Sequence, residues 1–158
     1  VYHGGMRPTR RLFLLSLPLL AACGRRAPAD LATRGDLAPG ASPQMRALID
    51  KWATAYAVPP RLVHRVVQRE SGYNPAARNG PYYGLMQILP QTARTMGHTG
   101  APEDLLNADT NLKYGVKYLR GAWLVSGGDA EAAISWYRCG YYYEAKRKGL
   151  LEETGLRG

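Results

Sequence analysis

The stretch Leu62-Val63-His64-Arg65-Val66-Val67-Gln68-Arg69-Glu70-Ser71 carries the clearest helical pattern in the chain. Its apolar pairs Leu62-Val63 and Val66-Val67 recur after four residues, which places them on one face of a helix. Gly72 follows directly and is suited to end the helix. The pattern predicts a helix over about residues 61–71 that is buried along this apolar face.

Glu70 lies at the C-terminal end of the same apolar face, at an edge that a substrate could reach. Apolar surroundings and the partial negative charge of a helix C-terminus both favour the uncharged form of a carboxyl group. A protonated carboxylic acid is the general acid that cleavage of a glycosidic bond requires. A surface ion pair of Glu70 with Arg65 or Arg69 is the alternative, and the helix pattern alone does not exclude it.

Helical spacing extends over the rest of the chain from Ser42 onward. Ser42 is a good N-cap, and the following apolar residues are Met45, Leu48, Ile49 and Trp52. Further helices are expected at about residues 90–96, 109–125, 129–138 and 142–148. Residues 82–88 are the only strand-like run, and a tight loop fits them equally well. The sequence therefore predicts an all-α fold with several helices in one domain.

Gln87 stands between Met86 and Ile88, in the apolar run that starts at Gly84. Core packing explains Leu85 and Ile88 but leaves a glutamine unexplained. Its amide offers both donors and an acceptor, which suit sugar hydroxyls and acetamido groups. We expect Gln87 to face a binding site.

Four short motifs in this order resemble a known family. They are Glu70-Ser71, Gly84-Leu85-Met86-Gln87-Ile88, Asn111-Leu112 with Gly115 and Tyr118-Leu119, and Ala133 with Tyr137. Together they are similar to the signature of the lytic transglycosylase SLT domain, which is related in fold to goose-type lysozyme. The resemblance covers about residues 45–149, and the ordered set is specific where any single motif would be weak.

The resemblance implies a compact lysozyme-like domain that cleaves peptidoglycan between N-acetylmuramic acid (MurNAc) and N-acetylglucosamine (GlcNAc). In that family one glutamate is the sole general acid and base, and the C6 hydroxyl of MurNAc closes a 1,6-anhydro ring in a lyase reaction. Glu70 matches the catalytic position, and Asn111 and Tyr118 match positions that brace the fold. The matching substrate-binding positions are Ser71, Gly84, Met86, Gln87 and Tyr137. No cofactor is implied, and no metal site is expected from the three widely separated histidines.

Two other functions remain open at this point. A lysozyme-like hydrolase would use the same scaffold, since fold does not settle chemistry. A non-catalytic peptidoglycan-binding lipoprotein is the second alternative. It gains weight because family members commonly have Asn after the fourth-motif tyrosine, whereas Arg138-Cys139-Gly140 follows Tyr137 here. Tyr82, Tyr83, Tyr141 and Tyr142 could line a glycan groove, and packing between helices explains each of them at least as well.

The N-terminal segment has the pattern of an export signal. Three arginines, a short apolar run and Leu20-Ala21-Ala22-Cys23 resemble a lipoprotein signal with its lipobox, with either Sec or twin-arginine export. We expect residues 1–22 to be a signal peptide with an upstream overrun and Cys23 to be lipidated. Residues 23–42 would form a flexible tether, 43–150 the catalytic domain, and 151–158 a C-terminal tail. The expected location is the periplasm, anchored by lipid to the outer membrane.

The chain is basic, with 21 Lys and Arg against 12 Asp and Glu among 158 residues. A basic surface suits an acidic polymer, and an exported protein meets anionic cell-wall glycan rather than nucleic acid. The charges are scattered, so a generic solvated surface explains part of the excess. With Cys23 lipidated, Cys139 would be a lone thiol without a disulfide. Peptidoglycan strands and the membrane are therefore the expected partners of a monomeric protein.

Overall fold

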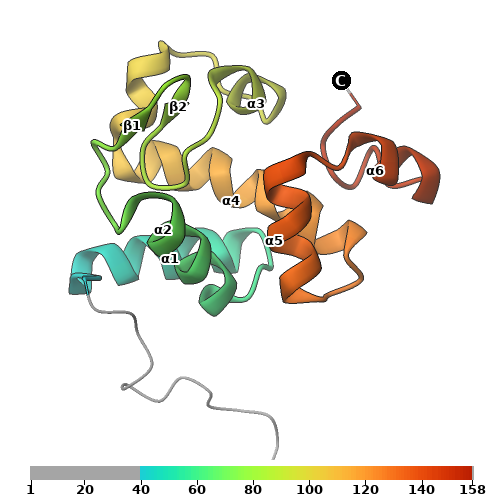
Figure 1. Ribbon diagram of the computed structural model, residues 1–158, viewed down its shortest axis with the longest axis horizontal. Coiled ribbons are helices and arrows are strands. Elements are labelled where there is room, and N and C mark those ends of the chain that lie inside the picture. The colour runs from blue at the N-terminus through green and yellow to red at the C-terminus, as the bar shows by residue number, and fades with distance from the viewer. Residues whose placement is uncertain (1–39, 158) are drawn as a thin grey trace, which may run out of the picture. The chain divides into compact units, whose positions relative to one another are not determined.

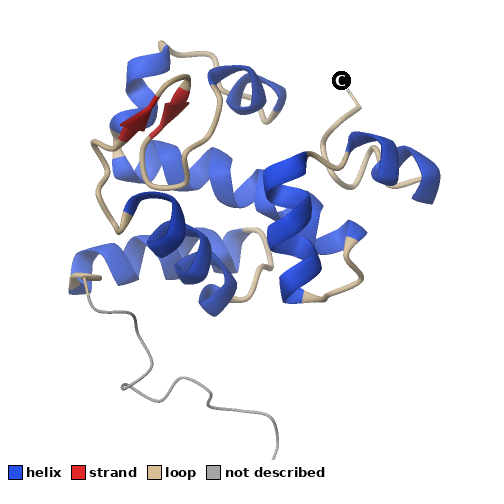
Figure 2. Ribbon diagram, in the orientation of Figure 1, coloured by secondary structure: helices blue, strands red, loops and turns tan. Residues whose placement is uncertain are grey.

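The computed structural model describes residues 40–157, and within them the chain is mostly helical (Figures 1 and 2). The elements in chain order are α1 (Pro43–Ala55), α2 (Pro60–Ser71), β1 (Arg78–Asn79), β2 (Tyr82–Tyr83), α3 (Pro90–Thr95), the 3-10 helix η1 (Pro102–Leu106), α4 (Ala108–Val125), α5 (Ala130–Cys139) and α6 (Tyr142–Lys148). The predicted all-α class is confirmed. Strand β2 lies within the strand-like run noted at residues 82–88, whereas β1 and η1 were not expected from the sequence pattern.

Helix α4 is the element around which the others pack, with α1, α3, α5, α6 and η1 all in contact with it. Its inner face is fully buried and contributes Leu112, Val116 and Leu119 to the main apolar core. Each such side chain stabilises the fold by about 1.5–3 kcal/mol through removal from water. Because the surrounding helices pack against the apolar surface of α4, this helix fixes the positions of their ends.

Helix α2 follows the predicted pattern closely. Its four apolar residues are at most 2% exposed, and Gly72 ends the helix in the left-handed conformation with φ 58°. His64 is buried as well, because its Nδ1 pairs with the Tyr73 hydroxyl at 3.0 Å and so satisfies both polar groups. Burial of the whole inner side of α2 leaves its C-terminal end, with Glu70, at the edge of the core.

Side chains cap the starts of three helices, α1, α4 and α5. Ser42 accepts a hydrogen bond from the Met45 N–H at 3.1 Å, and Asp129 accepts one from Ala132 at 2.7 Å, as predicted. Asn107 caps α4, while Asp109 in its first turn accepts hydrogen bonds from Lys51 and Trp52 of α1, each at 2.8 Å. The hydrogen bond from Lys51 and that from Trp52 hold the pKa of Asp109 below its usual value.

The boundaries of the folded unit differ from those predicted at both ends. Ala41 belongs to the core, so the expected tether over residues 23–42 ends earlier than proposed. Leu151 and Leu156 pack against the core and Thr154 is 3% exposed, so the expected C-terminal tail folds back onto the domain. Residues 1–22 and Cys23 lie outside the described residues. Over residues 40–157, no helix has the length and apolar character that crossing a membrane requires.

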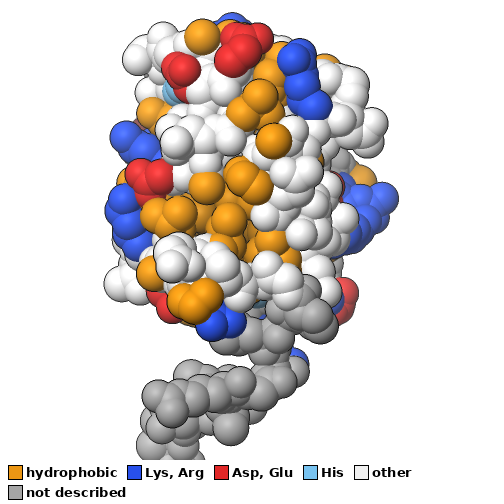
Figure 3. Space-filling view, turned by 90° about the vertical axis from the view of Figure 1, so that its left-hand side faces the viewer, with side chains coloured by type: hydrophobic (Ala, Val, Ile, Leu, Met, Phe, Trp, Pro, Cys, Tyr) orange, Lys and Arg blue, Asp and Glu red, His pale blue; other side chains and the backbone are white. Residues whose placement is uncertain are grey.

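Charged side chains of both signs lie interspersed on the surface. On the face shown in Figure 3, they surround a central band of hydrophobic side chains rather than forming one block of a single sign. Several are paired across elements, including Arg65 with Glu131 at 2.6 Å. On this face, the basic side chains are therefore spread out and do not form a single patch.

The loop after the hairpin is fixed by one buried amide. The Asn111 side chain accepts a hydrogen bond from the Met86 N–H at 2.9 Å and donates to the Tyr83 and Leu105 carbonyls, both at 2.8 Å. Asn111 is completely buried, and these bonds satisfy its oxygen and both of its donor hydrogens. This is the bracing role expected for it from the sequence.

We predict that Gly84→Ala is far more destabilising than Gly80→Ala. Both glycines have positive φ, so each alanine costs roughly 1–2 kcal/mol of backbone strain. A Cβ at Gly80 meets open space, whereas one at Gly84 would collide with the Leu105 carbonyl oxygen and the Asn111 amide. Urea unfolding should show Gly84→Ala to be less stable than Gly80→Ala by at least about 2 kcal/mol. Equal losses would contradict the close packing of this loop.

Candidate active site

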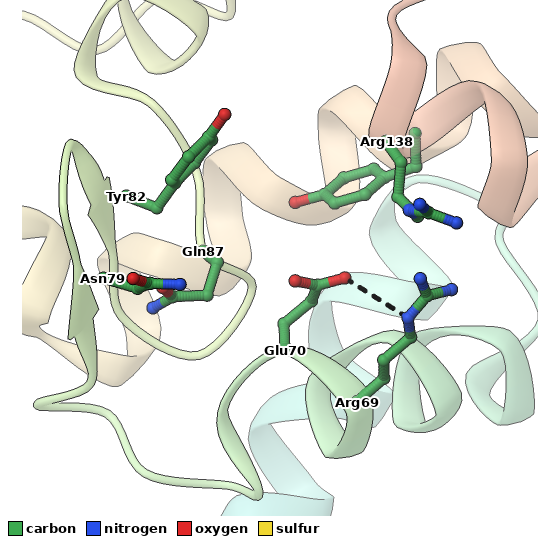
Figure 4. A pocket seen from close by; sticks show the side chains of 7 residues that line it. Arg69, Glu70, Asn79, Tyr82, Gln87 and Arg138 are labelled. Carbon is green, nitrogen blue, oxygen red and sulfur yellow. Dashed lines mark ion pairs between the residues drawn. The ribbon is translucent and has the colours of Figure 1, made fainter.

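A pocket of about 370 Å³ lies where α2, the hairpin and α5 meet (Figure 4). Its lining residues are Arg69, Glu70, Asn79, Tyr82, Gln87, Tyr137 and Arg138. The lining is mostly polar, and Glu70 is the only carboxyl group in it. The pocket therefore brings together three residues named from the sequence as site residues: Glu70, Gln87 and Tyr137.

Glu70 points from the end of α2 into this pocket (Figure 4), with 23% of its side chain exposed. Its nearest charged partner is the Arg69 Nε at 3.9 Å, which is too long for a hydrogen bond. Arg65, the other partner considered for it, instead pairs with Glu131. Within the part of the chain described, the carboxyl group is thus half-buried, reachable and without a short ion pair.

Tyr137 of α5 places its hydroxyl in the same pocket and donates it to the Met86 carbonyl oxygen at 2.8 Å. Burial raises the pKa of Tyr137 well above its usual value, and the nearby charge of Glu70 adds to the effect. Since its one proton is held by Met86, this hydroxyl can offer Glu70 only a lone pair. It is therefore suited to accept a hydrogen bond from a protonated Glu70.

Gln87 presents an acceptor to the pocket. Its Nε2 donates to the Gly84 and Ala77 carbonyls, at 2.9 and 3.2 Å, so both donors are used within the loop. The backbone at Gln87 has φ 47°, a conformation held by this local network. The amide oxygen remains able to accept a hydrogen bond from a hydroxyl or an amide N–H of a ligand. Asn79 lies beside it in Figure 4 and was not predicted, because nothing in a lone polar hairpin residue marks it as part of a site.

This pocket is not lined by three of the residues that were predicted to bind substrate: Ser71, Gly84 and Met86. The Ser71 hydroxyl donates to the Val67 carbonyl within α2, at 3.1 Å. Gly84 is buried beneath the loop, and the Met86 side chain is fully buried against Gly115. Met86 reaches the site only through its carbonyl oxygen, which holds Tyr137. These residues shape the wall, and direct contact of their side chains with a ligand is not supported.

The central pocket continues into two neighbouring hollows. One, of about 210 Å³, shares Tyr82, Gln87, Tyr137 and Arg138 with it and extends past Cys139. The other, of about 280 Å³, shares Arg69 and lies between α2 and α5. Because adjacent hollows share lining residues, together they form an elongated groove with Glu70 near its middle. An extended polymer fits this shape better than a small compact ligand does.

The aromatic residues expected in the groove divide into two groups. Tyr82 is 42% exposed and lines the central pocket. Tyr141 is buried and donates its hydroxyl to the Tyr118 carbonyl at 2.8 Å, and Tyr83 is buried with its hydroxyl bonded to Arg78. Tyr142 is exposed but lines none of the three hollows described. The expectation holds for Tyr82 and is wrong for the two buried rings, which stabilise the fold.

A helical domain whose central pocket holds a single carboxyl group, Glu70, is typical of the lysozyme-like class of protein. Residues 47–152 match the Transglycosylase SLT domain family. This match spans more than half of the chain, and the chain therefore belongs to the SLT domain family. The resemblance inferred from the four motifs is confirmed.

Individual relatives support the same assignment. The endo-type membrane-bound lytic murein transglycosylase A of Klebsiella pneumoniae (strain 342) is 35% identical over 85 residues, covering 48% of this chain and 41% of the relative. The transglycosylase of Enterobacteria phage PRD1 is 38% identical over 86 residues, covering 54% and 31%. The chain thus spans less than half the length of these relatives.

A solved structure has the same fold. The 70 kDa soluble lytic transglycosylase of Escherichia coli superposes with a TM-score of 0.56 at 23% identity. The match covers 68% of this chain and 18% of the larger protein. It bears on architecture alone and agrees with a helical SLT domain.

We predict that Tyr137→Phe destabilises the domain, because the Met86 carbonyl oxygen loses its partner in a largely buried position. The expected loss in free energy of unfolding is about 1–2 kcal/mol. Tyr82→Phe is the matched control, since its exposed hydroxyl bonds to no residue in the range 40–157. Chemical denaturation of both variants measures the difference. Equal stability of the two would show that the Tyr137–Met86 contact does not hold the loop.

Proposed function

We propose that this protein is a peptidoglycan lytic transglycosylase that cleaves the β-1,4 bond between MurNAc and GlcNAc, leaving 1,6-anhydro-MurNAc ends. The observation that carries the proposal is Glu70, a half-buried carboxyl group reachable from the middle of an elongated groove. Membership of the SLT domain family and the activities in the names of the relatives support it. Glycan strands of peptidoglycan are the proposed partner of a monomeric protein.

Glu70 would act first as general acid. Protonated Glu70 gives its proton to the glycosidic oxygen as the bond from C1 of MurNAc to that oxygen breaks. Before transfer, the Tyr137 lone pair helps to orient the acid, because the Tyr137 proton is already committed to Met86. Positive charge develops at C1 and the ring oxygen, and the neighbouring 2-acetamido group of the sugar helps to hold it.

Glu70 would then act as base. Its carboxylate takes the proton from the C6 hydroxyl of the same MurNAc while that oxygen bonds to C1 and closes the anhydro ring. The proton lost by Glu70 in the first step is thereby regained, and no water is consumed. Attack within one sugar ring gains from proximity, so one carboxyl group is enough. The Gln87 amide oxygen is placed to accept a hydrogen bond from a hydroxyl or acetamido N–H of the bound strand.

A lysozyme-like hydrolase is the nearest alternative, with water in place of the C6 hydroxyl. Enzymes with two carboxyl groups hold them about 5–9.5 Å apart across the scissile bond. The central pocket has Glu70 alone, and Glu131, the one other carboxyl group that lines the three hollows, is engaged by Arg65 at 2.6 Å. This arrangement favours the intramolecular reaction over one that needs a second acid.

We also propose that the protein acts in the periplasm and is held at the outer membrane by lipid on Cys23. The lipobox-like Leu20-Ala21-Ala22-Cys23 supports this, as does the name of the membrane-bound relative from Klebsiella pneumoniae. A single lipid chain holds a protein only weakly, so stable anchoring takes the several acyl chains of a processed lipoprotein.

We predict that Glu70→Gln lowers the release of anhydro-muropeptides from purified sacculi by at least about a hundredfold, because the amide cannot donate the proton. Mass analysis of the products identifies the chemistry. The thermal unfolding curve should stay nearly unchanged, and Glu103→Gln, an exposed acid on η1, is the matched control. Substantial activity of Glu70→Gln would refute the assigned role. Reducing ends from the unaltered protein would indicate a hydrolase, and binding to sacculi without release would indicate a binding protein.

We predict that Cys23→Ala moves the expressed protein from the membrane fraction to the soluble periplasmic fraction. The substitution removes the sulfur to which the lipid would be attached, and without acyl chains no apolar anchor remains. Fractionation followed by immunoblotting measures the distribution, with Cys139→Ala as the control cysteine substitution. Retention of the Cys23→Ala protein in the membrane would show that lipid on Cys23 is not the anchor.

A further inference from the structure

Two arginines occupy one end of the central pocket. Arg69 comes from the last turn of α2 and Arg138 from the last turn of α5. Figure 4 shows their guanidinium groups one above the other, on the side of Glu70 away from Asn79, Tyr82 and Gln87. The two cations thus face the same space beside the proposed acid.

Neither guanidinium group is satisfied within the described residues. Arg138 makes no hydrogen bond or ion pair to residues 40–157, and the only charged contact of Arg69 is the 3.9 Å approach to Glu70. Other surface arginines of this domain do have short partners, such as Arg65 with Glu131 and Arg147 with Glu144, both at 2.6 Å. Two guanidinium groups that line one pocket, with no carboxylate of residues 40–157 at hydrogen-bonding distance from either, form a site that favours binding of a carboxylate or phosphate.

The proposed chemistry makes this charge excess more costly. In the reactive form Glu70 is protonated and neutral, so the two arginines carry a net double positive charge at that end of the pocket. The transition state adds positive charge at C1 of MurNAc, close to Glu70. Like charges disfavour such a state unless an anion lies between them. A negatively charged group on the substrate itself would supply it.

We propose, as an extension of the function proposed above, that Arg69 and Arg138 bind a carboxylate of the muramyl residue at the scissile bond. MurNAc carries a lactyl ether on C3, whose carboxylate is free in strands without peptides and is consumed as an amide where a peptide is attached. Carboxylates of the peptide itself lie several bonds further from the sugar ring. The arginines stand beside Glu70 in the same pocket, and so the free lactyl carboxylate is the group that reaches them directly.

This assignment gives the enzyme a place in a reaction sequence. Peptide-free strands arise by hydrolysis of the amide bond between the lactyl group and the first amino acid. An amide hydrolysis of that class would supply the preferred substrate. The arginine pair is then a specificity determinant, which recognises that the peptide has been removed.

The test compares three forms of glycan strand: peptide-free, peptide-free with the lactyl carboxylates converted to neutral methylamides, and peptide-bearing. The unaltered protein should cleave the first with a kcat/KM about tenfold above the second, as expected for a charge-assisted contact at a partly exposed site. Arg138→Gln should abolish this preference, because it should slow cleavage of free-acid strands about tenfold more than cleavage of methylamide strands. Arg138→Lys should retain part of the preference, which should also weaken at high salt.

Arg94→Gln is the matched control, because it removes the same charge from an exposed position outside the three hollows. It should leave the preference intact. Equal cleavage of free-acid and methylamide strands by the unaltered protein would overturn the inference while leaving the proposed function standing. Faster cleavage of peptide-bearing strands, lost in Arg138→Gln, would assign the carboxylate to the peptide and overturn the lactyl source.

Absence of cleavage on every strand would refute the proposed function instead. In that case, binding decides the inference by itself. The Glu70→Gln protein should bind free-acid strands about tenfold more tightly than methylamide strands, and this difference should vanish when Arg138→Gln is added. Equal affinity for the two strands would overturn the arginine assignment.

Discussion

The fully buried amide of Asn111 is the contact on which the site depends. It joins α4 to the loop between β2 and α3 and to the end of η1, through hydrogen bonds to Met86, Tyr83 and Leu105. The amide has just enough donors and acceptors for these partners, so no other register of the loop satisfies them all. With Met86 fixed, its carbonyl oxygen can hold the Tyr137 hydroxyl, and α5 is thereby positioned against Glu70.

This arrangement also decides which hydrogen-bonding groups face a ligand. The Tyr137 proton is bound to Met86, and the Gln87 donors are bound to Gly84 and Ala77. What remains on both side chains is oxygen lone pairs. Tyr137 and Gln87 therefore present acceptors beside Glu70, which complement the hydroxyl and N–H donors of an acetamido sugar and the proton of the acid itself, whereas Arg69 and Arg138 present donors at the other end of the pocket.

Local patterns could be predicted from the sequence, and long-range contacts could not. The apolar pairs of α2 and its terminal Gly72 follow from helical periodicity and backbone preference, so Glu70 was placed correctly at an accessible helix end. Burial of Tyr141 depends on the Tyr118 carbonyl, 23 residues away, and on the bare surface of Gly121 beside it. No periodicity encodes that pairing. Asn79 and Arg69 likewise join the pocket only because the hairpin and the end of α2 meet there.

The same limit explains why the arginine pair carries information that neither arginine carries alone. A single arginine at the end of a helix is ordinary, since cations there interact favourably with the helix carbonyls. Arg69 and Arg138 both fit that description within their own helices. Folding brings the two helix ends to one pocket. Each arginine is favourable within its own helix, but in the pocket their two positive charges repel each other. The apo protein can relieve this repulsion through water because the pocket is open, whereas a bound strand excludes the water. In the proposal made above, an anion on the bound strand relieves this repulsion, so that the ligand completes the electrostatic balance of the site.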